Sequence, residues 1–304
     1  MLLKNALFSQ AGFGITANTI LLLFHVLPSL QDCRLKPSSL TVCHLALVHI
    51  AMFLTTVFLV SPDLFESMHF QNDFKCKALY YLSRVMQGLS ICTTCVLSTL
   101  QAITLSPSTS WMAQFKHKSV HFITRVYVFM WTLSLSSCAS LAFYVVAFSN
   151  LNQTRFLKLN KYCSISRMNS IVRYLFYALT TSRDVCFVGV MLISSMYLLN
   201  LLFKHQRRVQ YLHSTSHSST PCPEKRAMQT ILLLVGFFVV MFWMDFIISS
   251  FPTRLSDDGP VIQTIRRLVS KIYATVSPLV LLSSDRRVIG VLRSVKQAFN
   301  SLLH

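Results

Sequence analysis

The chain has 304 residues and a formal net charge of +18, with 53% hydrophobic and 12% charged residues. Soluble domains carry about 25% charged residues, so this composition excludes an ordinary soluble protein. The positive charge does not indicate a nucleic-acid-binding protein, because basic loops that flank membrane spans meet anionic lipid headgroups. We therefore expect the lipid bilayer, and no nucleic acid, among the partners of this chain.

Seven long apolar stretches follow one another along the chain, separated by short polar loops. A helix rises about 1.5 Å per residue and needs roughly 20 apolar residues to cross the hydrocarbon core of a bilayer. The stretches lie near residues 8–30, 40–60, 78–100, 120–148, 171–203, 227–250 and 261–282. They predict an all-α membrane protein, a seven-transmembrane helix bundle that forms a single domain over residues 1–304.

Both ends of the chain fit this bundle. The first stretch is too long for the apolar core of a signal peptide, so we expect it to be retained. Few residues precede it, which indicates that a ligand binds within the bundle. After the seventh stretch, apolar residues at helical spacing alternate with arginine and lysine over 285–303. This pattern predicts a short amphipathic helix lying on the inner leaflet.

A glycosylation sequon and two cysteines predict the orientation of the bundle. Asn152 begins the only Asn-x-Ser/Thr sequon, in the loop after the fourth stretch, and N-glycosylation requires an extracellular loop. Cys76 and Cys163 are the only cysteines placed in outer loops, where a disulfide can form and persist. The basic residues are divided too evenly between the two sides to decide. We expect a multi-pass plasma-membrane protein with an extracellular N-terminus.

Polar side chains inside the stretches are candidates for ligand binding. An ionisable group within a span costs about 2.5–3.5 kcal/mol on insertion scales, so it needs a partner or a role. Arg84 lies in the third stretch, with Gln87 one turn deeper on roughly the same face. In one interpretation Arg183 pairs with Asp245, or Arg84 with Asp184, across helices. In the other, Arg84 and also Arg183 contact a ligand.

The outer half of the bundle carries a surplus of positive charge, which favours the second interpretation. The charged residues counted there are the cations Arg84, Arg173, Arg183, Arg266, Arg267 and Lys271 and the acids Asp184 and Asp245. A cationic cavity attracts groups such as sulfate or carboxylate. We therefore expect a small anionic or strongly polar ligand. The candidate ligand contacts are Arg84, Gln87, Arg183, Asp184, Trp243, Asp245 and Lys271.

Several motifs resemble those of rhodopsin-like G-protein-coupled receptors. Gly14-Ile15-Thr16-Ala17-Asn18 is similar to the Gly-x-x-x-Asn of the first span in that class. Trp131 and Trp243 match its tryptophans in the fourth and sixth spans. Cys76 and Cys163 match the disulfide pair that ties its third span to the second outer loop. The amphipathic tail helix is also usual in that class.

Departures from the class point to a particular branch. His49 stands where the class carries the Asp of Leu-Ala-x-x-Asp, Gln101 falls at the Asp-Arg-Tyr position, and Asp245 replaces the span-six proline. Ser277-Pro278-Leu279-Val280-Leu281 stands in place of Asn-Pro-x-x-Tyr. These replacements resemble type 1 vomeronasal (pheromone) receptors. Similar runs, spread over essentially the whole chain, occur at residues 100–107, 183–185, 213–216, 223–227, 229–235, 245–248 and 273–278.

The resemblance implies a chemosensory receptor and not an enzyme, with no cofactor and no metal. Such a receptor binds small molecules within the bundle and activates a heterotrimeric G protein with an inhibitory-type Gα subunit. Ligand would bias a two-state bundle in which span six moves against spans three and five. The candidate G-protein contacts at the inner face are Gln101, Lys204, Arg207, Arg208, Lys225 and Arg226.

Other classes of protein fit less well. Lys271 has the spacing from Pro278 at which opsins attach retinal, but the counterion and Asp-Arg-Tyr are absent. A bitter-taste receptor is the nearest rival among receptors, and the outer cysteines and the vomeronasal runs argue against it. A secondary transporter predicts inverted repeats and Gly/Pro-broken spans, whereas no repeat is visible. A receptor-like chain that folds poorly is a further alternative, although no conspicuous motif is interrupted.

Two residues carry separate expectations. A neutral imidazole cannot replace a carboxylate as a ligand for a hard cation. We therefore expect His49 to be a buried hydrogen-bonding residue near Asn18 and Ser277, with weak or no sodium dependence of ligand affinity. Trp243 is expected to pack in the core, either as part of the activating movement or as inert packing.

Overall fold

The computed structural model describes residues 2–32, 37–60, 73–106, 120–139, 145–147, 157–158, 163–165, 170–212 and 260–284, with positions 233, 236, 237, 239, 240, 243 and 244. The elements, in chain order, are α1 (Leu2–Asp32), α2 (Pro37–Val60), α3 (Asp73–Leu105), α4 (Val120–Cys138), β1 (Val145–Ala147), β2 (Leu157–Lys158), β3 (Cys163–Ile165), α6 (Ser170–Leu212) and α8 (Pro260–Ser284). The described chain is therefore helical apart from three short strands, which confirms the predicted helical class.

Four of the described helices are long and apolar enough to cross a membrane, judged by length and composition. They are Lys4–Leu27 within α1, Pro37–Val60 of α2, Phe74–Thr104 within α3 and Tyr174–Leu201 within α6. Hydroxyl side chains inside these helices donate back to carbonyl oxygens of the preceding turn, as Thr56 does to Met52 at 2.7 Å. Such bonds satisfy polar groups where no water is available.

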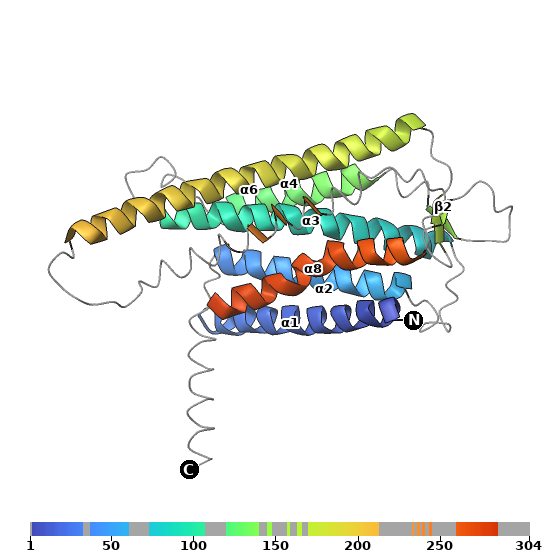
Figure 1. The fold of residues 1–304 in the computed structure, drawn as a ribbon, viewed down its shortest axis with the longest axis horizontal. Coiled ribbons are helices and arrows are strands. Elements are labelled where there is room, and N and C mark those ends of the chain that lie inside the picture. Colours follow the sequence, from blue (N-terminus) through green and yellow to red (C-terminus); the bar gives the residue numbers. More distant parts are fainter. Residues whose placement is uncertain are drawn as a thin grey trace, which may run out of the picture.

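Helix α3 lies at the centre of the described helices. It contacts α2, α4 and α6, whereas α8 contacts α1 and α2. In Figure 1, α1, α2 and α8 lie on one side of α3, and α4 and α6 lie on the other. A polar side chain on α3 can therefore face either group of helices, depending on its position around the helix.

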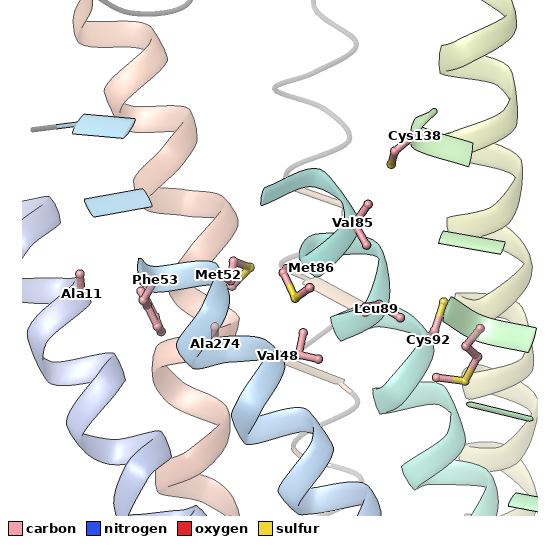
Figure 2. Packing of buried hydrophobic residues seen from close by; sticks show 11 residues of the cluster. Ala11, Val48, Met52, Phe53, Val85, Met86, Leu89, Cys92, Cys138 and Ala274 are labelled. Carbon is pink, nitrogen blue, oxygen red and sulfur yellow. The ribbon is translucent and has the colours of Figure 1, made fainter. Parts of the chain in front are cut away.

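The largest apolar core lies between α2 and α3 and extends to their neighbours (Figure 2). Met52 and Phe53 of α2 and Val85 and Leu89 of α3 are buried in it. Gly14 of α1 lies against Phe53 so closely that a Cβ atom there would overlap the ring. Small residues let membrane helices approach in this way, so Gly14 brings α1 close to α2.

The expected fourth span, 120–148, is wrong at its carboxyl-terminal end. Helix α4 ends at Cys138, and the valines that extend the apolar stretch belong to β1, which pairs antiparallel with β3. The sheet has the order β1-β3-β2 and lies at the end of the bundle that also holds the N-terminus (Figure 1). β-Branched residues suit strands, and pairing with β3 satisfies their backbone groups.

Two other predicted elements lie largely or wholly outside the described residues. Within 227–250 every position that the structure describes is helical. The predicted tail helix at 285–303 lies outside the described residues, as does Asp245. Their arrangement therefore stays a prediction.

Candidate functional site

The first part of the candidate ligand site is one face of α3. Arg84 is exposed, and its two terminal nitrogens donate to Gln87 Oε1 at 3.3 Å and to the hydroxyl of Tyr80 at 3.5 Å. The Arg84 guanidinium carbon also lies 5.8 Å from the centre of the Tyr80 ring, in the geometry of a cation–π contact. The helical spacing of the three residues places them on one face, so Tyr80 and Gln87 orient the arginine.

The second part of the site comes from α8. Arg267 interacts electrostatically with Arg84 and with the Tyr80 phenol of α3. Lys271 follows Arg267 one turn later on the same helix and is only 7% exposed. The sequence count of outer cations included Arg267 but did not make it a candidate contact, because nothing in the sequence shows which face of α8 meets Arg84.

Arg183 and Asp184 form an ion pair within α6. Arg183 Nε and Nη2 each lie 2.8 Å from Asp184 Oδ1. Among the described residues, Arg183 therefore takes an acidic partner from its own helix, and the expected partner Asp245 lies outside the described residues. The Asp184 carboxylate balances the charge of Arg183.

A buried hub of hydrogen bonds surrounds His49, a residue that is fully buried. Asn18 Nδ2 donates to the carbonyl oxygens of Gly14 at 2.7 Å and Ala274 at 3.0 Å, which leaves Asn18 Oδ1 as an acceptor. His49 Nδ1, at 3.2 Å from that oxygen, must then carry the proton. His49 Nε2 accepts from the Ser90 hydroxyl at 2.8 Å. These contacts describe a neutral imidazole with a single tautomer.

The hub joins four helices. Asn18 belongs to α1, His49 to α2 and Ser90 to α3, and Ser277 of α8 places its hydroxyl 3.4 Å from His49 Nδ1. Tyr273 of α8 meets the His49 ring edge-on. The predicted neighbours Asn18 and Ser277 are both present, while Ser90 and Tyr273 were not foreseen.

The hub leads to a prediction about sodium. Changing the medium from sodium to choline chloride should leave the ligand potency of the native receptor unchanged, because a neutral imidazole occupies the centre. In His49→Asp a carboxylate would face the oxygens of Asn18, Ser90 and Ser277, which are the ligand type that hard cations prefer. Agonist potency in this variant should then shift by about fivefold or more between the two salts. A sodium effect in the native receptor would contradict the neutral hub.

The remaining candidate residues are distributed as follows. Trp243 is 54% exposed, which contradicts the expectation that it packs in the core. Cys76 is disulfide-bonded, and Cys163 begins β3, whose partner strand β1 contacts α3. Asn152 lies outside the described residues.

The candidate G-protein contacts lie on α3 and α6 where the structure describes them. Gln101 is half-buried near the carboxyl end of α3, and Lys204 and Arg207 are exposed on the last turns of α6. In the same region the hydroxyls of Ser106 and Tyr197 lie 2.6 Å apart and join the two segments. The other three candidates, outside the described side chains, are Arg208, Lys225 and Arg226.

Comparisons with known proteins give a consistent result. A family model described as "Vomeronasal organ pheromone receptor family" matches residues 1–294. Vomeronasal type-1 receptor 90 of Rattus norvegicus is 41% identical over 289 residues, which cover 95% of this chain and 92% of that protein. Vomeronasal type-1 receptor 45 of Mus musculus is 38% identical over 291 residues, or 96% of this chain and 91% of that protein.

Proposed function

This chain belongs to the vomeronasal organ pheromone receptor family, and from that premise we propose how it works as a chemosensory receptor. A small molecule binds within the outer half of a seven-helix bundle. Binding shifts a two-state equilibrium of the helices, so that the inner face activates a heterotrimeric G protein with an inhibitory-type Gα subunit. The receptor spans the plasma membrane with its N-terminus outside.

The ligand that we propose is anionic. The observation that carries this proposal is that Arg84 on α3 and Arg267 on α8 lie within range of each other's charge. A sulfate or carboxylate placed between them would turn this repulsion into two charge-assisted contacts. Tyr80 and Gln87, which already hold Arg84, offer polar groups beside the anion. Lys271, one turn deeper on α8, adds a third cation.

The other predicted contacts take lesser parts in this proposal. The Arg183–Asp184 pair has little net charge to offer an anion and lies on α6, so we propose it as a neutral polar boundary of the ligand site. Trp243 and Asp245 of span six are proposed to contact the uncharged body of the ligand. An exposed tryptophan suits such a contact, since its ring has a large apolar face.

Orientation and covalent links follow the same proposal. We propose that Cys76 pairs with Cys163, which would fasten the small sheet to the start of α3 at the outer end of the bundle. Asn152 would then carry a glycan in the same outer loop. At the opposite end, Gln101, Lys204 and Arg207 would face the G protein together with Arg208, Lys225 and Arg226.

The function can be tested by expressing the full chain with a promiscuous Gα subunit and recording intracellular calcium. The probes are sulfated steroids and volatile acids, amines and ketones, each anion being compared with its uncharged parent alcohol or ester. We expect dose-dependent responses to one or more anionic probes, and weaker responses to the matched neutral compounds. With the inhibitory-type Gα subunit, the same probes should lower cellular cAMP.

The outcome that opposes the proposal is equally specific. Surface staining of an N-terminal tag on unpermeabilised cells first shows that the receptor has reached the plasma membrane. If a surface-expressed receptor then responds to amines or neutral ketones and ignores their anionic counterparts, the anionic ligand class is wrong. Calcium responses of untransfected cells provide the background.

A further inference from the structure

The Arg183 guanidinium is buried among three helices, and its ion pair with Asp184 holds only one of its edges. The residue is 8% exposed. Nε and Nη2 lie 2.8 Å from Asp184 Oδ1 on the same helix, whereas Nη1 makes no bond to Asp184, and the guanidinium lies within hydrogen-bonding reach of the Cys138 side chain of α4. The ion pair therefore balances the charge of Arg183 but does not fix the far edge of its guanidinium.

The far edge of the guanidinium lies against α3 at Gly88. A Cβ atom built on Gly88 would be 2.7 Å from both Nη1 and Nη2 and 2.8 Å from Cζ. These separations are shorter than van der Waals contact, so the guanidinium occupies space that any other residue at this position would fill. Gly88 is buried and so is Arg183, so the arginine would have to move its guanidinium within a packed interior to admit a Cβ atom.

Helix α4 is the third helix beside the Arg183 guanidinium. The charge of Arg183 acts on the thiols of Cys92 on α3 and Cys138 on α4. Gly88 and Cys92 are one turn apart on α3, and Ser134 and Cys138 are one turn apart on α4. The Ser134 hydroxyl is buried beside the Cys92 thiol. Arg183 thus occupies a junction of α3, α4 and α6.

This junction lies directly below the proposed ligand contact. Arg84 precedes Gly88 by one helical turn, so the two residues share a face of α3. The Cys138 side chain of α4 is hydrogen-bonded to Arg183 and lies within range of the charge of Arg84. A shift of the guanidinium at Gly88 would therefore change the packing of α6 immediately beneath Arg84.

We propose that Gly88 is a positioning residue: its missing side chain forms the seat for the Arg183 guanidinium and so sets the spacing of α3 and α6. The seat is a property of the folded receptor and does not depend on a ligand. Its effect on ligand potency rests on the function proposed above, because that effect requires Arg84 to contact the ligand.

Thermal unfolding of the purified receptor without ligand tests the seat. Alanine normally stabilises a helix relative to glycine, so an ordinary helical glycine should tolerate the change or gain from it. Gly88→Ala should instead lower the melting temperature by about 3 °C or more. Gly189→Ala on α6 is the matched control, because nothing lies within 4 Å of the added Cβ atom. This variant should have an unchanged or higher melting temperature.

The dependence on Arg183 is tested by repeating the substitution in a second background. In Arg183→Met the guanidinium is absent, and adding Gly88→Ala should then cause no further fall in melting temperature. Arg183→Lys, which keeps a charge for Asp184 but lacks the two terminal nitrogens, serves where the methionine variant yields too little folded receptor. The proposal would be overturned if Gly88→Ala lowered the melting temperature equally with and without the Arg183 guanidinium. It would also be overturned if Gly88→Ala caused no fall in the native background.

Ligand potency separates this inference from the proposed function. If both are correct, Gly88→Ala should weaken an anionic agonist by about 3–10-fold, and Gly189→Ala should leave its potency unchanged. If Gly88→Ala lowers the melting temperature only when Arg183 is present, and the potency of the anionic agonist is unchanged, the seat is supported. The same result would count against the ligand site at Arg84.

Discussion

Arg84→Ala is expected to reduce the potency of an anionic agonist roughly 10–100-fold, because a hydrogen bond to a charged group contributes about 1.5–3 kcal/mol. Tyr80 and Gln87 hold this guanidinium on one face of α3, and Arg267 approaches it from α8. Without Arg84, the anion keeps only the cations of α8, Arg267 and Lys271. The measurement is a calcium dose–response curve at matched surface expression.

Three comparisons sharpen the Arg84 result. Arg84→Lys keeps the charge but not the planar fork of donors, so its loss of potency should be smaller than that of alanine. Arg125→Ala removes an exposed arginine from α4 and should have no effect on potency. A neutral analogue of the agonist should lose little with any of the three variants. An unchanged potency in Arg84→Ala would exclude this residue from the ligand site.

His49→Leu is expected to have the largest effect on folding among the hub residues. It leaves Asn18 Oδ1 without its donor and the Ser90 hydroxyl without its acceptor, and both groups are buried. An unsatisfied buried polar group costs about 1–3 kcal/mol. We therefore expect the melting temperature of the purified receptor to fall by roughly 5–10 °C, with less receptor at the cell surface.

A double-mutant cycle identifies the cause of this loss. In Asn18→Ala the acceptor for His49 Nδ1 is already gone, so adding His49→Leu should lower the melting temperature by less than it does in the native receptor. Leu47→Ala is the control on the same helix. Its side chain is 53% exposed, and its loss should matter little. Fully additive losses for Asn18 and His49 would mean that the hub does not act as a unit.

Much of the helical structure could be predicted because apolarity is a local property. The length of an apolar stretch predicts a membrane helix without any knowledge of its neighbours. The prediction failed after Cys138, where the apolar stretch continues but β1 pairs with β3. A continuous apolar stretch does not distinguish helix from strand by itself, and the partner strand lies further along the chain.

Within the candidate ligand site, only the local contacts were predictable. Arg84 and Gln87 were placed together because residues three apart share a helix face, and the structure joins them. The sequence offered Arg183 either a distant acid or a ligand, and it did not point to the adjacent Asp184, with which Arg183 pairs. Arg267 was missed as a contact because its approach to Arg84 depends on how α8 is rotated against α3.

By itself the sequence determined that this chain is a membrane receptor of the vomeronasal pheromone receptor family, since composition, apolar stretches and motifs can be seen residue by residue. It also showed that a histidine replaces the usual acid in the second span. Only the tertiary structure decided that Ser90 and Tyr273 complete the hub around His49, that Arg267 lies within range of the charge of Arg84, and that Gly88 lies against the Arg183 guanidinium. Such contacts depend on the rotation and spacing of helices far apart in the chain, and apolar stretches carry no information about either.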